Sequence, residues 1–187
     1  GEGKEYFAEG RARWTRARLD ALGHAAGRTL DFGCGTGSAT PYLLDALGAR
    51  EVTGSDPSLA SLEVARREHG PRGARFVPPG GIAAAGPFDT AFCNGVFHHI
   101  PVADRAAAVA AVHAALRPGG VFAFWENNPW NPGTRYVMSR IPFDRDAVTL
   151  TPPESRALLR AGGFDVLRSD SLFWFPRALA ALRPLER

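Results

Sequence analysis

The sequence predicts an α/β fold in which a mostly parallel, doubly wound sheet carries helices on both faces. Three observations lead to this prediction. Short apolar segments alternate with helical segments of about 10 to 15 residues. The first apolar segment runs into a glycine-rich turn at residues 33–37 and then into a helix. Polar residues follow several of the apolar segments, at the strand ends beyond which parallel sheets of this kind bind ligands.

The expected strands are short and rich in apolar residues. They cover residues 28–32, 51–55, 74–77, 88–94, 121–125 and 165–175. The expected helices end at glycine, at proline or near the end of the chain. They cover residues 5–22, 38–47, 59–69, 102–116, 153–161 and 176–186. We expect a loop at 78–81, a turn at 117–120 and an irregular, proline-containing insertion at 127–148.

Length and composition predict a single domain over residues 1–187, with 1–24 as a helical cap and 127–148 as a substrate-side insertion. Hydrophobic residues make up 45% and charged residues 22% of the chain, which is ordinary for a globular protein. No run of about 18 apolar residues is present, so we expect no membrane span. Two cysteines and no apolar leader favour a cytoplasmic, reducing setting.

The positive charge of the chain has a simple interpretation. The formal net charge is +3 and the pI is about 9.3. Lys4 is the only lysine, and the arginines are scattered along the expected helix surfaces. The densest group, at residues 11–18, is interrupted by Trp14 and is typical of a solvated helix face. We therefore expect no nucleic-acid partner, and the oligomeric state stays open.

The glycine turn and Asp56 predict a nucleotide-like ligand. Glycines at 33, 35 and 37 remove side chains where the backbone turns, so a ligand can lie on the main chain at a helix start. Asp56 follows the second strand about 20 residues later, where a carboxylate can accept hydrogen bonds from both ribose hydroxyls. The alternative for Asp56 is an N-cap, with Pro57 in the first helical turn. The turn lacks the Lys-Ser/Thr pair of a P-loop, and its Gly-x-Gly-x-Gly spacing argues against a nicotinamide dehydrogenase.

Four segments together resemble the motifs of class I S-adenosylmethionine (SAM) dependent methyltransferases of the small-molecule branch. They are residues 30–37 (Leu-Asp-Phe-Gly-Cys-Gly-Thr-Gly), 52–57, 88–101 and 116–122. The resemblance implies a Rossmann-like fold, SAM as the cofactor, and methyl transfer to an oxygen, nitrogen or carbon of a small-molecule acceptor. The alternative is a SAM-binding protein of the same fold that transfers no methyl group and serves as a scaffold or in another reaction, such as cyclisation.

The resemblance also implies which residues contact the cofactor. Residues 31–37 would surround the methionine end and the sugar, Asp56 would hold the ribose, and residues 94–96 would form the floor. Relatives often place an acid after the third strand for the adenine, and here residues 81 and 82 take that place. Tyr6 would close over the cofactor, unless its helix simply packs on the core. The expected cofactor-binding residues are Tyr6, Asp31, Gly33, Cys34, Gly35, Gly37, Asp56, Pro57, Ser58, Gly81, Ile82, Asn94, Gly95 and Val96.

His98, His99 and Glu126 are the candidate catalytic residues. The two histidines follow the fourth strand, and imidazole titrates near neutral pH, which suits a general base. Alternatively, a histidine caps the helix that begins near residue 102. Glu126 opens the segment 126–132, which either faces the substrate or forms a rigid connection with asparagines in turns.

Two further expectations concern metals and the end of the chain. His24, His69 and His113 show no metal-ligand spacing, so no metal site is predicted. Asp144 and the arginines at 135, 140 and 145 would pair with each other or with an acidic substrate. Class I methyltransferases usually finish with an antiparallel seventh strand. After residue 175 no such strand is evident, so it is either absent or lies in a tail outside this sequence.

Overall fold

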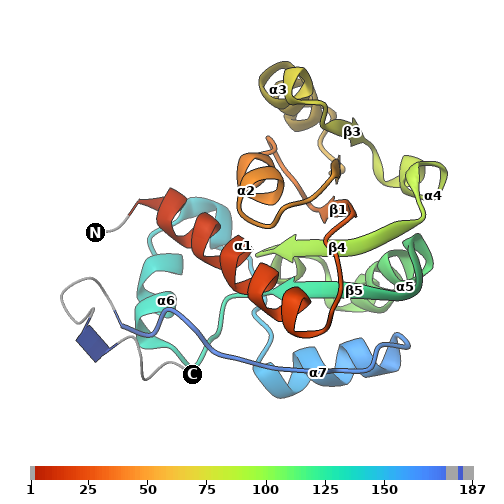
Figure 1. The fold of residues 1–187 in the computed structure, drawn as a ribbon. Helices are drawn as coiled ribbons and strands as arrows, with labels where there is room; N and C mark the ends of the chain where they lie inside the picture. Colours follow the sequence, from red (N-terminus) through yellow and green to blue (C-terminus); the bar gives the residue numbers. More distant parts are fainter. Residues whose placement is uncertain (1–2, 176–180, 183–187) are drawn as a thin grey trace. The chain divides into compact units, whose positions relative to one another are not determined.

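The computed structural model describes residues 3–175 and 181–182, and within them the chain forms one five-stranded parallel sheet (Figure 1). The strand order is β3-β2-β1-β4-β5. The strands are β1 (Arg28–Phe32), β2 (Glu51–Ser55), β3 (Arg75–Val77), β4 (Phe88–Asn94) and β5 (Leu116–Trp125). The chain moves outward from β1 to β3 and then returns to β4 beside β1. The carboxyl ends of β1 and β4 therefore flank the switch point, where such sheets bind ligands.

The described helices are mostly short. They are α1 (Lys4–Ala21), α2 (Thr40–Asp45), α3 (Leu59–His69), α4 (Ile82–Ala85), α5 (Arg105–Ala115), α6 (Pro132–Met138) and α7 (Pro152–Ala161). Five 3-10 turns lie between them: η1 (Gly70–Arg72), η2 (Pro79–Gly81), η3 (Phe97–His99), η4 (Val102–Asp104) and η5 (Pro142–Asp144).

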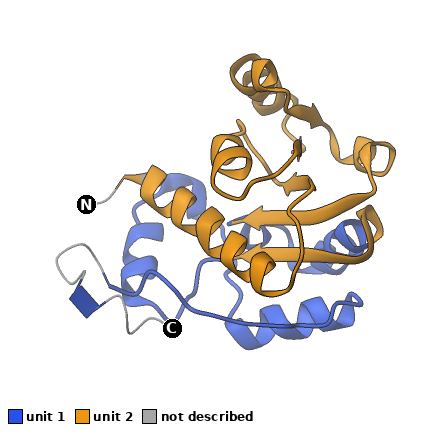
Figure 2. Ribbon diagram, viewed as in Figure 1, with its two compact units in different colours: residues 1–2, 95–113, 126–187 blue, residues 3–94, 114–125 orange. Residues whose placement is uncertain are grey.

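The chain divides into two compact units (Figure 2). Residues 3–94 and 114–125 form the sheet unit, which contains all five strands. Residues 1–2, 95–113 and 126–187 form the second unit. The expectation of a single domain over the whole chain stays a prediction.

In the sheet unit, α1, α2 and α3 share one hydrophobic core with the sheet. Leu19 of α1, Leu43 of α2 and Leu62 of α3 are at most 1% exposed and belong to a single cluster with Val52 and Phe92. Most residues of β1 and β4 are buried, as in parallel strands covered on both faces. The N-terminal helix is thus part of the core, as the packing alternative has it.

In the second unit, polar caps define where the helices start. Thr151 and Glu154 form a reciprocal capping box at the first turn of α7. Asn131 caps α6, since its side-chain oxygen accepts hydrogen bonds from the backbone N–H groups of Gly133 and Thr134. Pro132 occupies the first helical position of α6, where its missing N–H costs nothing.

Two sequence predictions about strands are wrong. Residues 165–175 contain no strand. Side-chain amides of Asn128 and Asn131 bond Ser171 Oγ at 3.4 Å and Phe173 O at 3.3 Å, and Phe173 has a positive φ of 63°, which interrupts extended geometry. The predicted turn at 117–120 is the beginning of β5. The pairing of β4 with β5 carries an irregularity there, which accommodates the extra residues.

The helix predictions also need corrections. The loop at 78–81 contains the turn η2 and leads directly into α4. The insertion at 127–148 is not irregular throughout, because it includes α6 and η5. The helices expected at 38–47 and 102–116 are shorter, since a turn precedes α2 and η4 precedes α5. The helix expected at 176–186 lies almost entirely outside the described residues, and within them the sheet has no antiparallel strand.

Candidate cofactor cradle and acceptor-side cluster

The glycine turn of the sheet unit is tied to the end of β2. The backbone N–H groups of Gly33 and Cys34 both donate to Ser55 O, at 2.8 and 3.0 Å. Gly33, Gly35 and Gly37 have positive φ values of 76°, 52° and 78°, a conformation that favours glycine. A Cβ at Gly35 would have no described atom within 4 Å. The turn therefore presents bare backbone to open space, as a ligand cradle requires.

Asp56 closes this cradle from the end of β2. One carboxylate oxygen accepts the N–H of Gly35 at 2.9 Å, and the other accepts the N–H of Ser58 at 2.8 Å. The N-cap alternative for Asp56 is wrong, because Ser58 caps α3 and accepts the N–H of Ser61. Each oxygen of Asp56 keeps a second lone pair, so the carboxylate can still accept two ribose hydroxyls.

Asp31 is a buried acid at the same strand ends. It lies on β1, is 2% exposed, and its Oδ2 has no hydrogen-bond partner in the described part of the chain. Burial, and after it the charge of Asp56, raise the pKa of Asp31 to about 7. A buried acceptor without a partner fits a ligand that brings a donor, such as the ammonium group of the methionine end of SAM.

The remaining predicted cofactor residues of the sheet unit are less defined. Burial, followed by the charges of Asp31 and Asp56, raises the pKa of the Cys34 thiol, which therefore stays protonated and inert. Asn94 ends β4 and pairs with Trp125. Ile82 is buried at the start of α4, whereas Tyr6 is 40% exposed on α1. The cofactor contacts predicted for these residues stay predictions.

Sequence reasoning missed two residues that support the cradle, Gly54 of β2 and His69 of α3. A Cβ at Gly54 of β2 would lie 2.8 Å from the Cys34 sulfur and 2.7 Å from the Phe76 ring. A Cβ at Gly37 would lie 2.7 Å from the ring of His69, the last residue of α3. The available signal was a glycine in the interior of a strand, which often marks close packing.

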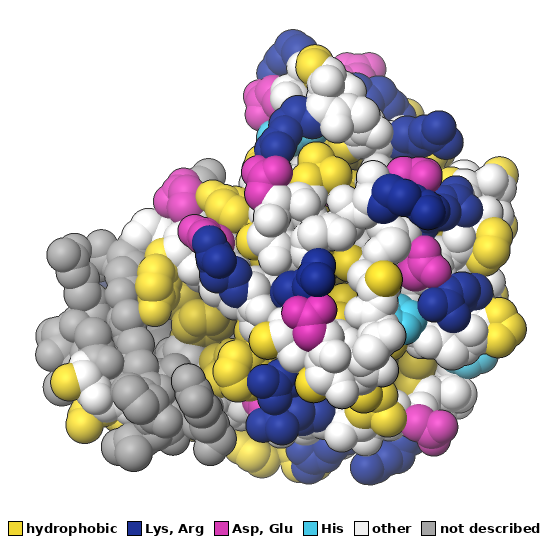
Figure 3. Space-filling model, in the orientation of Figure 1, with side chains coloured by type: hydrophobic (Ala, Val, Ile, Leu, Met, Phe, Trp, Pro, Cys, Tyr) yellow, Lys and Arg dark blue, Asp and Glu magenta, His cyan; other side chains and the backbone are white. Residues whose placement is uncertain are grey.

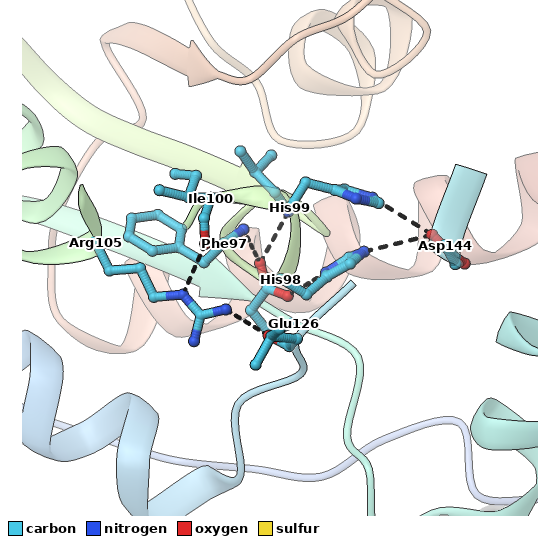
Figure 4. Close-up of polar contacts among 9 residues, drawn as sticks. Phe97, His98, His99, Ile100, Arg105, Glu126 and Asp144 are labelled. Carbon is cyan, nitrogen blue, oxygen red and sulfur yellow. Dashed lines mark hydrogen bonds and ion pairs between the residues drawn. The ribbon is translucent and has the colours of Figure 1, made fainter. Parts of the chain in front are cut away.

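The acceptor-side cluster of the second unit is built on Glu126 (Figure 4). Its Oε2 lies 2.6 Å from His98 Nδ1, and its Oε1 accepts the backbone N–H groups of Val96 and Phe97 at 2.8 and 2.7 Å. The side chains of His98 and Glu126 are only 3% and 6% exposed. Val96, expected to line the cofactor floor, thus also anchors Glu126 through its backbone.

His99 and Asp144 complete this cluster. Asp144 Oδ1 lies 3.4 Å from His99 Nε2 and 3.7 Å from His98 Nε2, and the two imidazole rings have centroids 4.0 Å apart. Burial, and then the neighbouring His98, lower the pKa of His99. The helix-cap alternative for the histidines is wrong, because both ring Nε2 atoms face Asp144 (Figure 4).

Arg105, which sequence reasoning missed, holds the backbone around the cluster. It is 6% exposed, and its guanidinium donates to the carbonyl oxygens of Ile100 and Val148. The N–H of Val148 in turn donates to His98 O at 2.9 Å. The end of the insertion is therefore fixed to the histidine turn by long-range contacts that no local motif reveals.

Asp144 also lines a hollow of about 590 Å³ in the second unit, together with Arg135, Arg140 and Arg145. The expected pairing of these arginines with Asp144 does not occur among the described residues, since Asp144 faces the histidines. The hollow is therefore predominantly positive, and the predicted contact with an acidic substrate stays a prediction.

The surface gives two further observations. On the face drawn in Figure 3, Lys and Arg side chains are interspersed with Asp and Glu. Among the described residues, no helix combines the length and the apolar character needed to cross a bilayer.

The fold is a parallel α/β sheet in which the glycine turn and Asp56 follow the carboxyl ends of β1 and β2. A family model described as a methyltransferase domain matches residues 30–122. The chain belongs to the class I SAM-dependent methyltransferases, whose cofactor is SAM.

Individual relatives agree with this family. The chain is 34% identical over 171 residues to a ubiquinone biosynthesis O-methyltransferase of Methylobacterium sp., covering 81% of this chain and 65% of that protein. It is 35% identical over 102 residues to a trans-aconitate 2-methyltransferase of Rhizobium leguminosarum, covering 51% and 37%. A SAM-dependent methyltransferase structure from Clostridium acetobutylicum has the same fold, with a TM-score of 0.66, 17% identity and coverage of 87% and 84%. The chain spans between 24% and 65% of the length of the curated relatives that it matches.

Proposed function

We propose that the protein transfers a methyl group from SAM to a small-molecule acceptor, and that His98, His99 and Glu126 activate that acceptor. The observation that carries this proposal is the buried His98 ring, which Glu126 fixes at 2.6 Å in the segment directly after β4. The relatives named for trans-aconitate and for ubiquinone biosynthesis support a small acceptor.

The cofactor fits the residues of the sheet unit. Gly35 leaves backbone open beside Asp56, and the orphaned Oδ2 of Asp31 suits an ammonium donor. When bound, SAM supplies an electrophilic methyl group, which bonds to the acceptor's electron pair while the electrons of the broken C–S bond stay on sulfur. The residues of this chain have to hold the cofactor and prepare the acceptor.

Glu126 orients the His98 ring. In the tautomer whose Nδ1–H donates to Glu126 Oε2, the lone pair of the ring lies on Nε2. The Nε2 atoms of His98 and His99 both face the carboxylate of Asp144. An oxygen or nitrogen acceptor must lose a proton as the new bond to carbon forms, and these two ring nitrogens are the groups that would assist.

Cofactor binding tests the first half of the proposal. By calorimetry, S-adenosylhomocysteine should bind the protein, and Asp56→Asn should weaken that binding about tenfold or more, or about 1.4 kcal/mol. Asp20→Asn is the matched control, since Asp20 pairs with Arg16 on the surface of α1. Absence of binding at high micromolar concentration would contradict the proposal.

Turnover tests the second half. Release of S-adenosylhomocysteine should be measured with hydroxyl- and carboxylate-bearing small molecules, trans-aconitate included. Once an acceptor is found, His98→Ala and Glu126→Gln should lower kcat about 100-fold, within the range typical of acid–base groups. Their affinity for S-adenosylhomocysteine should stay unchanged. Full turnover in both variants would remove the cluster from the mechanism, and binding without turnover on any acceptor would favour the SAM-binding alternative.

A further inference from the structure

We propose that His98 Nε2, His99 Nε2 and Asp144 Oδ1 form a binding site for a divalent transition-metal cation such as Zn²⁺. One donor atom from each residue lies within 4.8 Å of the others. Imidazole nitrogens with a carboxylate oxygen are a donor set that zinc takes readily. Only the consequence for the acceptor, argued below, rests on the proposed function.

The distances suit a shared cation better than direct hydrogen bonds. Asp144 Oδ1 lies 3.4 Å from His99 Nε2 and 3.7 Å from His98 Nε2. Hydrogen bonds between nitrogen and oxygen measure about 2.7 to 3.2 Å. Tetrahedral zinc with bonds of about 2.0 to 2.1 Å separates its ligands by roughly 3.3 Å. Small rotations of the side chains therefore bring all three donors to a common centre.

A second observation is the support behind the ligands. Metal-bound histidines usually donate their other ring N–H to a carboxylate, which fixes the ring and raises its basicity. Glu126 occupies that position at 2.6 Å from His98 Nδ1, and two backbone N–H groups fix Glu126 itself. The ring of Phe143 packs beside His99, with centroids 4.4 Å apart. Glu126 thus holds His98, and Phe143 packs against His99, before a cation arrives.

Burial gives a third observation. The side chains of His98 and Asp144 are 3% and 8% exposed, and His99 is 26% exposed. A nearly buried carboxylate is costly unless it is paired, and neither ring nitrogen approaches it to hydrogen-bond distance. A divalent cation between the three groups would balance the charge of Asp144 and would bind the Nε2 lone pairs of His98 and His99.

The site also has a consequence for the acceptor. Three protein ligands leave a coordination position open, as catalytic zinc sites do. Asp144 lines the hollow that also contains Arg135, Arg140 and Arg145, so an oxygen-bearing acceptor, favoured if it is anionic, can reach this position. Coordination would lower the pKa of its hydroxyl, and the proton would leave to solvent before the oxygen attacks the methyl carbon. The histidines would then act as ligands of the cation that activates the acceptor.

Direct metal binding tests the site without an acceptor. Chelator-treated protein should be titrated with Co²⁺, whose visible absorption reports tetrahedral or five-coordinate sites, and then with Zn²⁺. We expect one equivalent of Co²⁺ at micromolar affinity and its displacement by Zn²⁺. Asp144→Asn and His99→Ala should each weaken binding at least tenfold, and Glu126→Gln should weaken it by a similar factor with all ligands kept.

The controls keep the result specific. Asp146→Asn removes an exposed carboxylate two residues from Asp144, and His24→Gln removes a histidine of the sheet unit, so both variants should bind Co²⁺ normally. Circular dichroism and S-adenosylhomocysteine binding establish that each variant is folded. No binding at 100 µM Co²⁺ or Zn²⁺, or equal binding by the Asp144 and His99 variants, would overturn the metal site. Full turnover after chelation would overturn the acceptor's coordination while leaving the proposed methyl transfer intact.

Discussion

At the scale of single residues, Asp31 and Asp56 are two carboxyl groups at the same edge of the sheet, and they lie in different environments. Asp56 is held by the N–H groups of Gly35 and Ser58, which stabilise its charge. Asp31 is 2% exposed, and its Oδ2 has no partner among the described residues. Burial therefore makes Asp31 the acid that keeps its proton up to about neutral pH.

The raised pKa of Asp31 predicts a pH-dependent stability. Its folded pKa of about 7 lies above the value of 3.8 for a free carboxyl, so the unfolded chain loses this proton first as the pH rises. The folded state is therefore destabilised progressively between about pH 4 and 7, by on the order of 4 kcal/mol for a shift of about three units. Below pH 4 this penalty is absent.

Asp31→Asn removes this titration. Relative to the unsubstituted protein, the variant should gain free energy of unfolding between pH 5 and pH 8, measured by urea denaturation at both values. An equal difference between the two proteins at pH 5 and pH 8 would contradict the raised pKa. The variant should also bind S-adenosylhomocysteine more weakly at pH 8, because it loses the carboxylate proposed for the ammonium group.

At the scale of elements, the turn between β1 and α2 contains one glycine that packs against the core and one that is open to a ligand. Gly37 faces inward, where a Cβ would meet the His69 ring at 2.7 Å and the Ala65 methyl at 3.2 Å. Gly35 faces open space. Both have a positive φ, yet the physical reason for glycine differs between them: one position lacks room, and the other leaves the backbone accessible to a ligand.

This difference predicts that Gly37→Ala mainly lowers stability, whereas Gly35→Ala mainly weakens ligand binding. Gly37→Ala should cost about 2 kcal/mol of unfolding free energy, from backbone strain and overlap, with little effect on cofactor affinity per folded molecule. Gly35→Ala should cost only the strain of about 1 kcal/mol but should weaken S-adenosylhomocysteine binding at least tenfold. Adding His69→Ala to Gly37→Ala should recover part of the lost stability, as a double-mutant cycle would report. Additive losses would show that the ring does not set the cost.

At the scale of the whole molecule, the residues proposed for the cofactor and those proposed for the acceptor belong to different compact units. The glycine turn, Asp31 and Asp56 belong to the sheet unit, whereas His98, Glu126 and Asp144 belong to the second unit. The polypeptide passes from one to the other directly after Asn94 and Trp125, which pair at the ends of β4 and β5. Each ligand should therefore stabilise a separate set of backbone amides.

Hydrogen exchange followed by mass spectrometry checks this division. S-adenosylhomocysteine at a hundredfold excess over its Kd should slow exchange of amides in residues 33–37 and 56–58 by up to roughly a hundredfold. Zn²⁺ should instead slow exchange around residues 98–99 and 144–148, where the Val148 N–H bonds His98 O. Zn²⁺ protection confined to the glycine turn would contradict the assignment of the metal to the second unit.

The amino-acid sequence alone was sufficient to predict the α/β class, the first five strands in outline, and the glycine turn with Asp56 at the strand ends. These features are local, because apolar runs define parallel strands, and glycines with an acid at fixed spacing define the ends of β1 and β2. The sequence also singled out His98, His99 and Glu126 as candidates, since Glu126 directly follows β5 and the two histidines come shortly after β4. Their catalytic role stays a prediction. It failed at residues 165–175, where apolar composition predicts a strand but a positive φ at Phe173 and the amides of Asn128 and Asn131 prevent one.

The contacts among these residues could be read only from the folded chain. Asp144 lies 45 residues beyond His99 in the chain, and Arg105 reaches Val148 across 43 residues, so no spacing rule connects them. The burial that raises the pKa of Asp31 and the contact of His98 Nδ1 with Glu126 also depend on long-range packing. A local sequence pattern predicts that a residue lies at a strand end. The free energy of ionising its side chain depends on burial and on neighbouring charges, which only the folded chain supplies.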